Sequence, residues 1–443
     1  MRTMRKRSLL FFIFILVFLC IATAGLYNLP PVHDRAAWRI ESLRTRLRYA
    51  LNPPQQVIFV PQEQEQIAEI VNATMQALLP KATETPQPSP TATPTQPGPT
   101  ATPLPTPTPT LTPTPLPEKV VLTGIRHEYQ QMNNCGPTTL AMALSFWGWQ
   151  GDQRDTRAYL RPNFVNIDDK NVNPFEMVNY VETQTGLKAL TRVGGDLDLL
   201  KRFLAAGFPV IVEKGLQQHA GDWMGHYALI NGYDDVRQRF ISQDSYIMPN
   251  LPVPYADLAD RWWRDFNYVY LVVYPPEREA EVLAILGLQA DETANYQHAA
   301  ALAEEETQSL SGRDLFFAWY NLGSSRTGLS DYAGAAQAYD QAFALYPTIP
   351  EEDRPWRMLW YQVGPYVAYY NTGRYQDVIR LGNQTLDLVG KPVLEESYYW
   401  LGRAREAQGD LEKAIYDYEK AVEINPISTP AKDELKRLGI SYP

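Results

Sequence analysis

The chain begins with an almost uninterrupted apolar run, residues 9–29, which follows a basic N-terminus. Because about 20 apolar residues cross the ~30 Å hydrocarbon core of a bilayer, this run predicts a transmembrane anchor within residues 1–30. The basic flank predicts that the N-terminus stays in the cytoplasm and that the rest of this single-pass cell-membrane protein is extracytoplasmic. A cleaved signal peptide is the alternative, since Ala22-Thr23-Ala24 has the spacing of a cleavage site.

Two segments without a core pattern follow. In residues 31–82, apolar residues such as Ile40, Leu43 and Leu47 recur at helical spacing among arginines, which predicts a helical spacer. Residues 83–117 are dominated by Pro and Thr and hold a large share of the 36 prolines of the chain. Such a tract cannot bury apolar surface and favours extended polyproline II, at about 3.1 Å per residue. We interpret it as a disordered, semi-rigid stalk that reaches on the order of 100 Å from its base.

The next pattern is a short amphipathic helix with a cysteine at its start. Cys135-Gly136-Pro137 opens the helix, and apolar residues then recur at helical spacing between positions 140 and 147. At a helix N-terminus the dipole favours the thiolate, so Cys135 is a candidate nucleophile. The other cysteine, Cys20, lies in the predicted anchor, which leaves Cys135 without a disulfide partner outside the membrane. The alternative is that Cys135 is a small buried apolar residue.

A candidate base and a candidate carboxylate follow on a predicted hairpin. Residues 227–230 predict a strand, residues 231–235 a turn, and residues 239–243 a second strand that leads to Asp244. A hairpin of this length brings His226 and Asp244 near one another on paired strands. Together with Cys135 they would form a catalytic triad with cysteine as the nucleophile. The alternative role for His226 is structural.

Residues 118–275 resemble the C39-like branch of the papain-fold cysteine peptidases. The resemblance rests on two motifs together, QQMNNCGPTTLAMAL and GHYALINGYDD. The resemblance implies an α+β papain-like domain in which Cys135 attacks a carbonyl carbon. It also implies that His226 acts as general base and then as general acid, and that Asp244 orients the histidine.

The same resemblance assigns the oxyanion hole to a glutamine upstream of the cysteine, here Gln130, with Gln131 as the alternate. The sequence departs from the family pattern at two positions. Gln130 stands five residues before Cys135, where the family often has six, and Ser245 stands where a proline commonly follows the aspartate.

Residues 276–443 change to helical patterns rich in Ala, Tyr and Glu, and these patterns repeat. Gly323 and Ala335 recur as Gly402 and Ala414 at the same offset. This resembles the tetratricopeptide repeat of about 34 residues, in which small residues let paired helices pack closely. A degenerate unit around Gly373 gives a third repeat, about the minimum for a stable stack. The resemblance implies an all-α domain that binds a protein partner.

The formal net charge of −10 argues against a nucleic-acid-binding protein, which usually carries a basic stripe. Triad chemistry requires neither a metal nor an organic cofactor, and we expect neither. The sequence therefore predicts a membrane-anchored, extracytoplasmic cysteine peptidase that hydrolyses a peptide or isopeptide bond in a peptide or protein substrate. An inactive papain-like scaffold whose repeats bind protein partners, and a cell-wall amidase or transpeptidase, are the alternatives.

Overall fold

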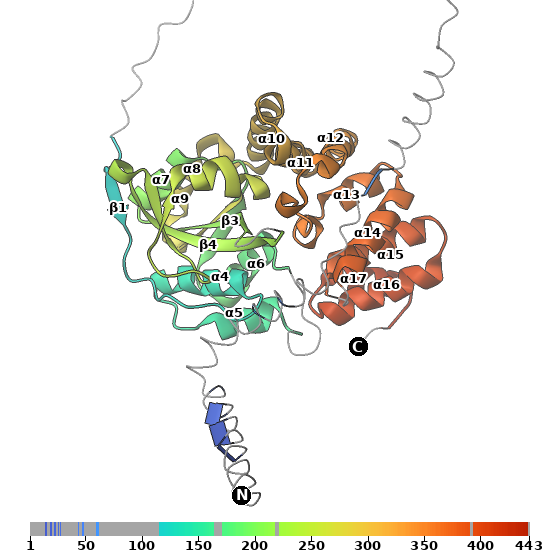
Figure 1. Cartoon of the computed structure of the whole chain (residues 1–443), viewed down its shortest axis with the longest axis horizontal. Helices are drawn as coiled ribbons and strands as arrows, with labels where there is room; N and C mark the ends of the chain where they lie inside the picture. Colours follow the sequence, from blue (N-terminus) through green and yellow to red (C-terminus); the bar gives the residue numbers. More distant parts are fainter. Residues whose placement is uncertain are drawn as a thin grey trace, which may run out of the picture.

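The computed structural model describes residues 115–163, 171–217, 221–389 and 393–441, together with residues 59–61 and scattered positions before residue 50 (Figure 1). The predicted anchor, spacer and Pro/Thr stalk therefore lie almost entirely outside the described residues. Among the residues that are described, no helix combines the length and the apolar character needed to cross a bilayer.

A mixed α/β domain built on an antiparallel sheet comes first in the described chain. The strands run in the order β2-β7-β3-β4-β5-β6, and β1 pairs with the C-terminal end of β4. Every pairing in the sheet is antiparallel. The strands are β1 (Lys119–Val121), β2 (Lys188–Arg192), β3 (Val210–Gln217), β4 (Trp223–Asp234), β5 (Arg239–Gln243), β6 (Leu251–Pro254) and β7 (Tyr270–Tyr274).

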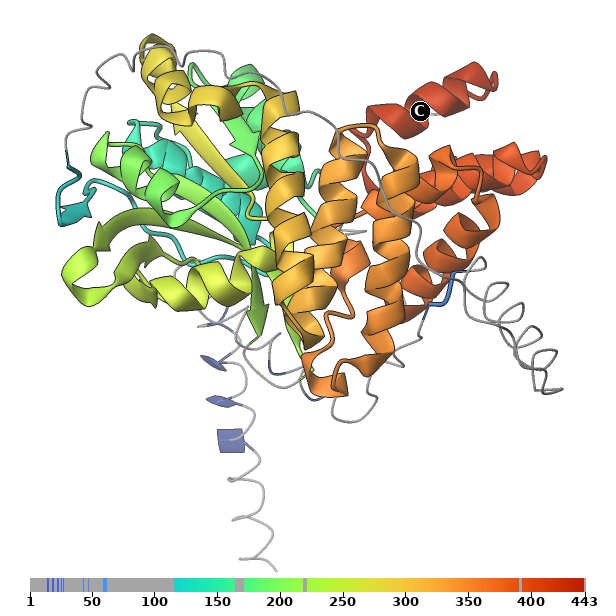
Figure 2. The ribbon, with the colours of Figure 1, turned by 90° about the horizontal axis from the view of Figure 1, so that it is seen from above.

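Helices cover both faces of this sheet (Figures 1 and 2). On one face lie α4 (Cys135–Phe146), α5 (Gln153–Leu160) and α6 (Pro174–Gln184), and on the other α7 (Leu197–Ala205) and α9 (Glu279–Leu286). Alternate residues of β3 divide between the two cores: Ile211 packs with Leu140 of α4, whereas Val210 packs with Phe203 of α7. Burial on both faces explains why β3 is apolar without alternation at its start. The short helix α8 (Tyr255–Asp257) continues into a π-helical turn, Leu258–Trp262.

The predicted hairpin turn at residues 231–235 is wrong in position. β4 continues to Asp234, and the turn lies at residues 235–238, where Gln238 adopts the left-handed conformation with φ of 50°. Gly232 marks a close approach between strands, because a Cβ at this position would lie 2.5 Å from the carbonyl oxygen of Val120 on β1. Glycine inside a strand often marks such a close approach of another backbone.

Helices alone make up the rest of the described chain. They are α10 (Glu292–Ser309), α11 (Gly312–Gly328), α12 (Tyr332–Leu345), α13 (Gly364–Asn371), α14 (Tyr375–Val389), α15 (Glu395–Ala407), α16 (Leu411–Ile424) and α17 (Thr429–Arg437). Gly323 and Gly402, which the sequence placed at equivalent positions of two repeats, each allow two helices to pack closely. A Cβ on Gly323 would lie 2.7 Å from the ring of Tyr339, and a Cβ on Gly402 would lie 2.6 Å from the ring of Tyr418. The prediction of a mixed α/β domain followed by a helical repeat region is confirmed.

The helical region packs directly against the sheet domain. Trp223 and Phe266 of the sheet domain belong to the same apolar cluster as Phe317 and Tyr339 of α11 and α12. The indole of Trp223 stacks on Phe266 with ring centroids 5.8 Å apart and lies 6.1 Å from Phe317. Seen from above, α10 and α11 run alongside the sheet domain (Figure 2). The end of β4 that carries His226 therefore lies next to the helical region.

Candidate active site

Cys135 is the first residue of α4, which packs on β4. Asn134, just before it, is fully buried, and its side-chain amide donates to Thr138 Oγ1 at 3.2 Å and to Gln153 Oε1 at 3.0 Å. These bonds fix the backbone at the start of the helix. The backbone N–H groups of Gly136 and Tyr227 help to lower the pKa of the Cys135 thiol. Donors at a helix N-terminus stabilise a thiolate.

His226 lies near the start of β4, and Asp244 directly follows β5. Nε2 of His226 lies 3.0 Å from Oδ1 and 3.1 Å from Oδ2 of Asp244. The imidazole also interacts with the Cys135 thiol, whose pKa it lowers, and since Nε2 faces the carboxylate, Nδ1 is the nitrogen that remains for the thiol. Asp244 Oδ1 accepts further hydrogen bonds from the N–H groups of Tyr246 and Ile247, each at 3.0 Å. The structure thus brings His226 and Asp244 into hydrogen-bond contact and places Cys135 within electrostatic reach of His226.

Burial alone would favour the neutral form of each of these three groups, but their mutual interactions outweigh it. Burial lowers the pKa of His226, yet the charge and hydrogen bond of Asp244 and the hydrogen bond of Cys135 raise it to about 9. Burial raises the pKa of Cys135, yet the hydrogen bond and charge of His226 bring it below its ordinary value. Burial also opposes ionisation of Asp244, whose pKa is nevertheless held far below its usual range by the charge of His226. The arrangement favours a thiolate–imidazolium pair at neutral pH.

Gln130, the predicted oxyanion donor, is bound to the residue that follows Asp244. Its backbone N–H donates to the carbonyl oxygen of Ser245 at 2.9 Å, and the Ser245 hydroxyl donates to Gln130 Oε1 at 2.9 Å. Because the amide oxygen is engaged, Nε2 is the group that Gln130 presents as a donor. The side chain of Gln131 instead accepts a hydrogen bond from Arg157 of α5. Of the two glutamines, the geometry favours Gln130, and the unexpected Ser245 is its partner.

The helical region contributes a wall to this site, which the sequence analysis did not anticipate. Tyr361, just before α13, lies edge-on to Trp223 and to Phe266, with ring centroids 6.0 and 5.9 Å apart. Its ring packs against Gly225, the residue that precedes His226, where an added Cβ would lie 3.1 Å from the ring. Burial raises the pKa of the Tyr361 phenol, and the charge of Cys135 adds to that effect. Tyr361 therefore lies within electrostatic reach of the nucleophile.

A loop of the helical region also fastens the start of β4. Arg357, which is 4% exposed, donates to the carbonyl oxygen of Trp223 at 2.6 Å and to Asp222 Oδ1 at 2.9 Å. The indole of Trp356 donates to the carbonyl oxygen of Gly221 at 3.0 Å. The sequence feature that could have indicated these contacts is the run WRMLWY at residues 356–361, which is richer in aromatic residues than the repeat pattern.

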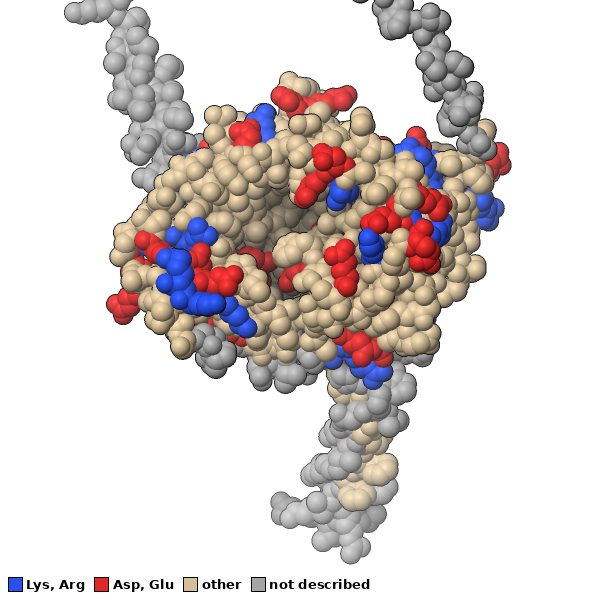
Figure 3. Space-filling model, turned by 180° about the vertical axis from the view of Figure 1, so that it is seen from behind, with Lys and Arg blue, Asp and Glu red and all other residues tan. Residues whose placement is uncertain are grey.

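A cavity of about 200 Å³ lies between the sheet domain and the helical region. Glu213 of β3 lines it together with Phe266, Tyr339 and Tyr361, and it contributes the only carboxyl or amine among the described lining residues. Burial raises the pKa of Glu213 to about 8, and the charge of Cys135 contributes to the rise. The face of the molecule opposite to that in Figure 1 is hollowed near its middle (Figure 3).

Within the described residues, no group of three or more His, Cys, Asp or Glu side chains has the geometry to hold a metal ion. The aspartates that flank β4 pair with arginines. Asp222 pairs with Arg357 at 2.9 Å, and Asp234 pairs with Arg237 at 2.8 Å.

The sheet domain is an antiparallel sheet flanked by helices, and the helix that begins at Cys135 packs on the strand that carries His226. Residues 123–269 match the Peptidase_C39 like family, and residues 395–427 match the tetratricopeptide repeat. The chain therefore carries a C39-like peptidase domain followed by a tetratricopeptide repeat, as the motifs predicted.

Solved structures and one curated protein are similar to parts of the chain. A protein described as a C39-like peptidase from Bacillus anthracis is 17% identical and covers 35% of this chain and 98% of its own, with a TM-score of 0.30. The double glycine motif protease from an AMS/PCAT transporter, in complex with the leader peptide, is 16% identical over the same shares, with a TM-score of 0.26. The FK506-binding protein-like protein of Mus musculus is 33% identical over 112 residues. That match spans 24% of this chain and 30% of the relative.

Proposed function

We propose that the protein is a cysteine peptidase in which Cys135 is the nucleophile, His226 the general base and acid, and Asp244 the residue that orients the histidine. The observation that carries this proposal is the hydrogen bond between His226 and Asp244 beside Cys135, whose pKa His226 lowers. Side chains from a helix, a strand and a strand end converge there, and all three lie in the segment similar to C39-like peptidases.

The mechanism follows from the protonation states that the site favours. The Cys135 thiolate attacks the carbonyl carbon of the substrate and forms a C–S bond, while the π electrons of the carbonyl move to its oxygen. Nε2 of Gln130 and the backbone N–H of Cys135 stabilise the resulting oxyanion. The imidazolium of His226 then donates its proton to the leaving amine, and the C–N bond breaks to leave a thioester. Neutral His226 next takes a proton from water, whose oxygen attacks the thioester. Collapse of the second intermediate releases the carboxylic acid and restores the thiolate–imidazolium pair.

The proposal includes a place and a type of substrate. The apolar run at residues 9–29 and its basic flank support a membrane anchor with the peptidase on the extracytoplasmic side. The cavity between Glu213 and Tyr361 supports a substrate chain that lies between the sheet domain and the helical region. The proposed substrate is a peptide or protein, and the proposed reaction is hydrolysis of a peptide or isopeptide bond.

The decisive experiment measures the alkylation rate of Cys135 across pH in the full chain, purified in detergent and carrying Cys20→Ser so that one thiol remains. We expect fast alkylation that persists well below the ordinary thiol pKa of about 8.5, and we expect His226→Ala to slow it. Hydrolysis of a peptide library should require Cys135, so that Cys135→Ala abolishes cleavage. An ordinary thiol profile that is indifferent to His226→Ala would overturn the enzyme proposal and favour an inactive scaffold.

A further inference from the structure

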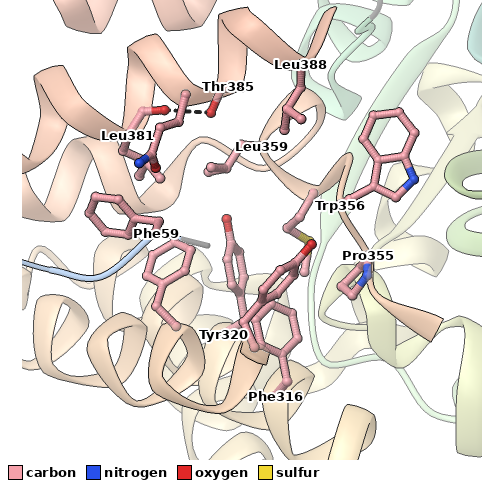
Figure 4. Close-up of a pocket in the computed structure, with 13 residues that line it drawn as sticks. Phe59, Phe316, Tyr320, Pro355, Trp356, Leu359, Leu381, Thr385 and Leu388 are labelled. Atoms are coloured by element: carbon pink, nitrogen blue, oxygen red, sulfur yellow. Dashed lines mark hydrogen bonds between the residues drawn. The ribbon is translucent and has the colours of Figure 1, made fainter. Parts of the chain in front are cut away.

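A segment that precedes the Pro/Thr tract lies in a pocket on the repeat helices (Figure 4). The ring of Phe59 is 5% exposed and packs edge-on to Phe343 of α12, with ring centroids 5.0 Å apart. The ring of Tyr369 of α13 lies 6.2 Å away, and the guanidinium of Arg380 of α14 lies 5.7 Å from the Phe59 centroid. Leu381 of α14 lines the same pocket. Phe59 is thus enclosed by three helices far from it in sequence.

The backbone of this segment is held as well as its side chain. Arg380 Nη2 donates to the carbonyl oxygen of Val60 at 2.8 Å, and Asp377 Oδ1 holds the same guanidinium nitrogen at 2.9 Å. Phe59 and Pro61 are buried, whereas Val60 between them is 40% exposed. Burial of alternate residues is the pattern of an extended peptide on a surface, and Pro61 has no N–H that would need a partner.

The pocket also differs from a filled core. An open volume of about 50 Å³ remains beside the residues that line it. Well-packed protein interiors contain few voids that are large enough for water. An aromatic pocket, an arginine fixed by a carboxylate and an extended occupant are together the features of a peptide-binding groove.

We propose that this groove of the repeats is an intramolecular peptide-binding site and that its occupant is the chain's own segment at residues 59–61. The groove recognises an extended segment with one inserted aromatic ring and a carbonyl oxygen for Arg380. The described part of the sheet domain begins at residue 115, so this docking adds a second point at which the chain before the sheet domain contacts the folded body.

Competition in trans tests this assignment. The probe is a fluorescent synthetic peptide of residues 55–65, titrated into the full chain in detergent as wild type, Phe59→Ala or Val60→Ala. A tethered segment competes at a high effective concentration, so the peptide should bind Phe59→Ala at least about tenfold more tightly than the wild type. Val60 is exposed, so Val60→Ala should behave as the wild type does. A peptide with alanine in place of its phenylalanine should not bind.

A second readout separates docking from a loss of folding. Phe59→Ala should raise amide hydrogen exchange in α14, and the added peptide should restore protection, which no general unfolding would allow. Phe59→Leu keeps most of the apolar volume and should give an intermediate affinity for the peptide. Equal affinity for Phe59→Ala and the wild type, or absence of binding to either Phe59→Ala or Phe59→Leu, would overturn the proposal. None of these readouts depends on catalysis, so the result stands apart from the proposed peptidase activity.

Discussion

Nε2 of His226 lies 3.0 Å from Oδ1 of Asp244, and the two side chains are 2% and 0% exposed. A buried carboxylate in contact with an imidazole stabilises the protonated ring, which accounts for the rise in the pKa of His226 to about 9 despite burial. The pair therefore determines which nitrogen faces Cys135 and how strongly the imidazolium is favoured. Both properties lead to predictions for variants of Asp244.

Asp244→Asn and Asp244→Ala should differ in how far they lower kcat/KM. Asparagine retains an oxygen that accepts the Nε2 hydrogen bond, so kcat/KM should fall by only about tenfold, the cost of losing charge assistance. The basic limb of the pH–rate profile should move to lower pH, because the charge that raises the pKa of His226 is gone. Alanine removes orientation as well and should cost about 10²- to 10⁴-fold. Identical effects of the two substitutions on rate and profile would contradict an orienting role for Asp244.

Gln130 and Ser245 should affect kcat and leave KM nearly unchanged. Loss of one oxyanion donor costs about 10²- to 10³-fold in kcat, which is the effect expected for Gln130→Ala. Ser245→Ala removes only the bond that orients Gln130 and should cost about tenfold or less, without a change in the pH profile. Gln131→Ala is the matched control, since its side chain pairs with Arg157, and it should leave kcat as it is. A larger effect for Gln131 than for Gln130 would reverse the assignment.

Arg357 should couple the helical region to catalysis. Arg357→Gln removes charged donors from the carbonyl oxygen of Trp223 and from Asp222, so the free energy of unfolding should fall by about 1.5–3 kcal/mol. Because these bonds hold the strand that carries His226, kcat/KM should fall and amide exchange at the start of β4 should rise.

The control for Arg357 is Arg354→Gln, whose guanidinium donates to the carbonyl oxygens of Ile349 and Pro347 within its own loop. It should leave exchange in β4 unchanged. Unaltered exchange in β4 of Arg357→Gln would show that the loop does not support the site.

The sequence predicted the parts of this site that depend on local pattern. The prediction of a cysteine at a helix start does not depend on the hairpin turn. The predicted proximity of His226 and Asp244 holds even with the turn misplaced, because the start of β4 and the end of β5 lie at the same end of the paired strands. The turn itself was misplaced because Gly232 serves the approach of β1, a partner that lies far away in the chain. Tyr361 and Arg357 could not be predicted, since their role exists only once the helical region packs against β4. In the sequence, Ser245 was only a departure from the family pattern. Its hydrogen bond to Gln130 could be seen only in the folded structure.

Two acidic residues at the contact between the domains should make stability depend on pH. Burial raises the pKa of Glu176 on α6 to about 8, and the charge of Glu396 on α15 adds to the rise. Glu396 accepts hydrogen bonds from the side-chain amides of Asn171 and Asn173 at 3.2 and 2.8 Å, so the repeats are fastened to the sheet domain here. The folded state retains a proton on Glu176 that the unfolded chain releases near its ordinary pKa of 4.5. Stability should therefore fall as pH rises from about 4.5 to about 8.

Glu176→Gln should remove this loss while it keeps an oxygen that accepts the N–H of Asn173, a bond that Glu176 Oε2 makes at 2.7 Å. Its melting temperature should match that of the wild type near pH 5 and exceed it by about 2–4 °C near pH 8.5, which corresponds to roughly 1 kcal/mol for a domain of this size. Glu182→Gln, an exposed position on the same helix, should change neither value. If both variants melt as the wild type does at every pH, the contact between α6 and α15 carries no buried proton. Glu213, whose pKa is also raised to about 8, and His226 then remain as groups whose raised pKa makes stability fall with pH. The His226–Asp244 pair predicts a loss confined to higher pH, between the ordinary His pKa of 6.5 and about 9.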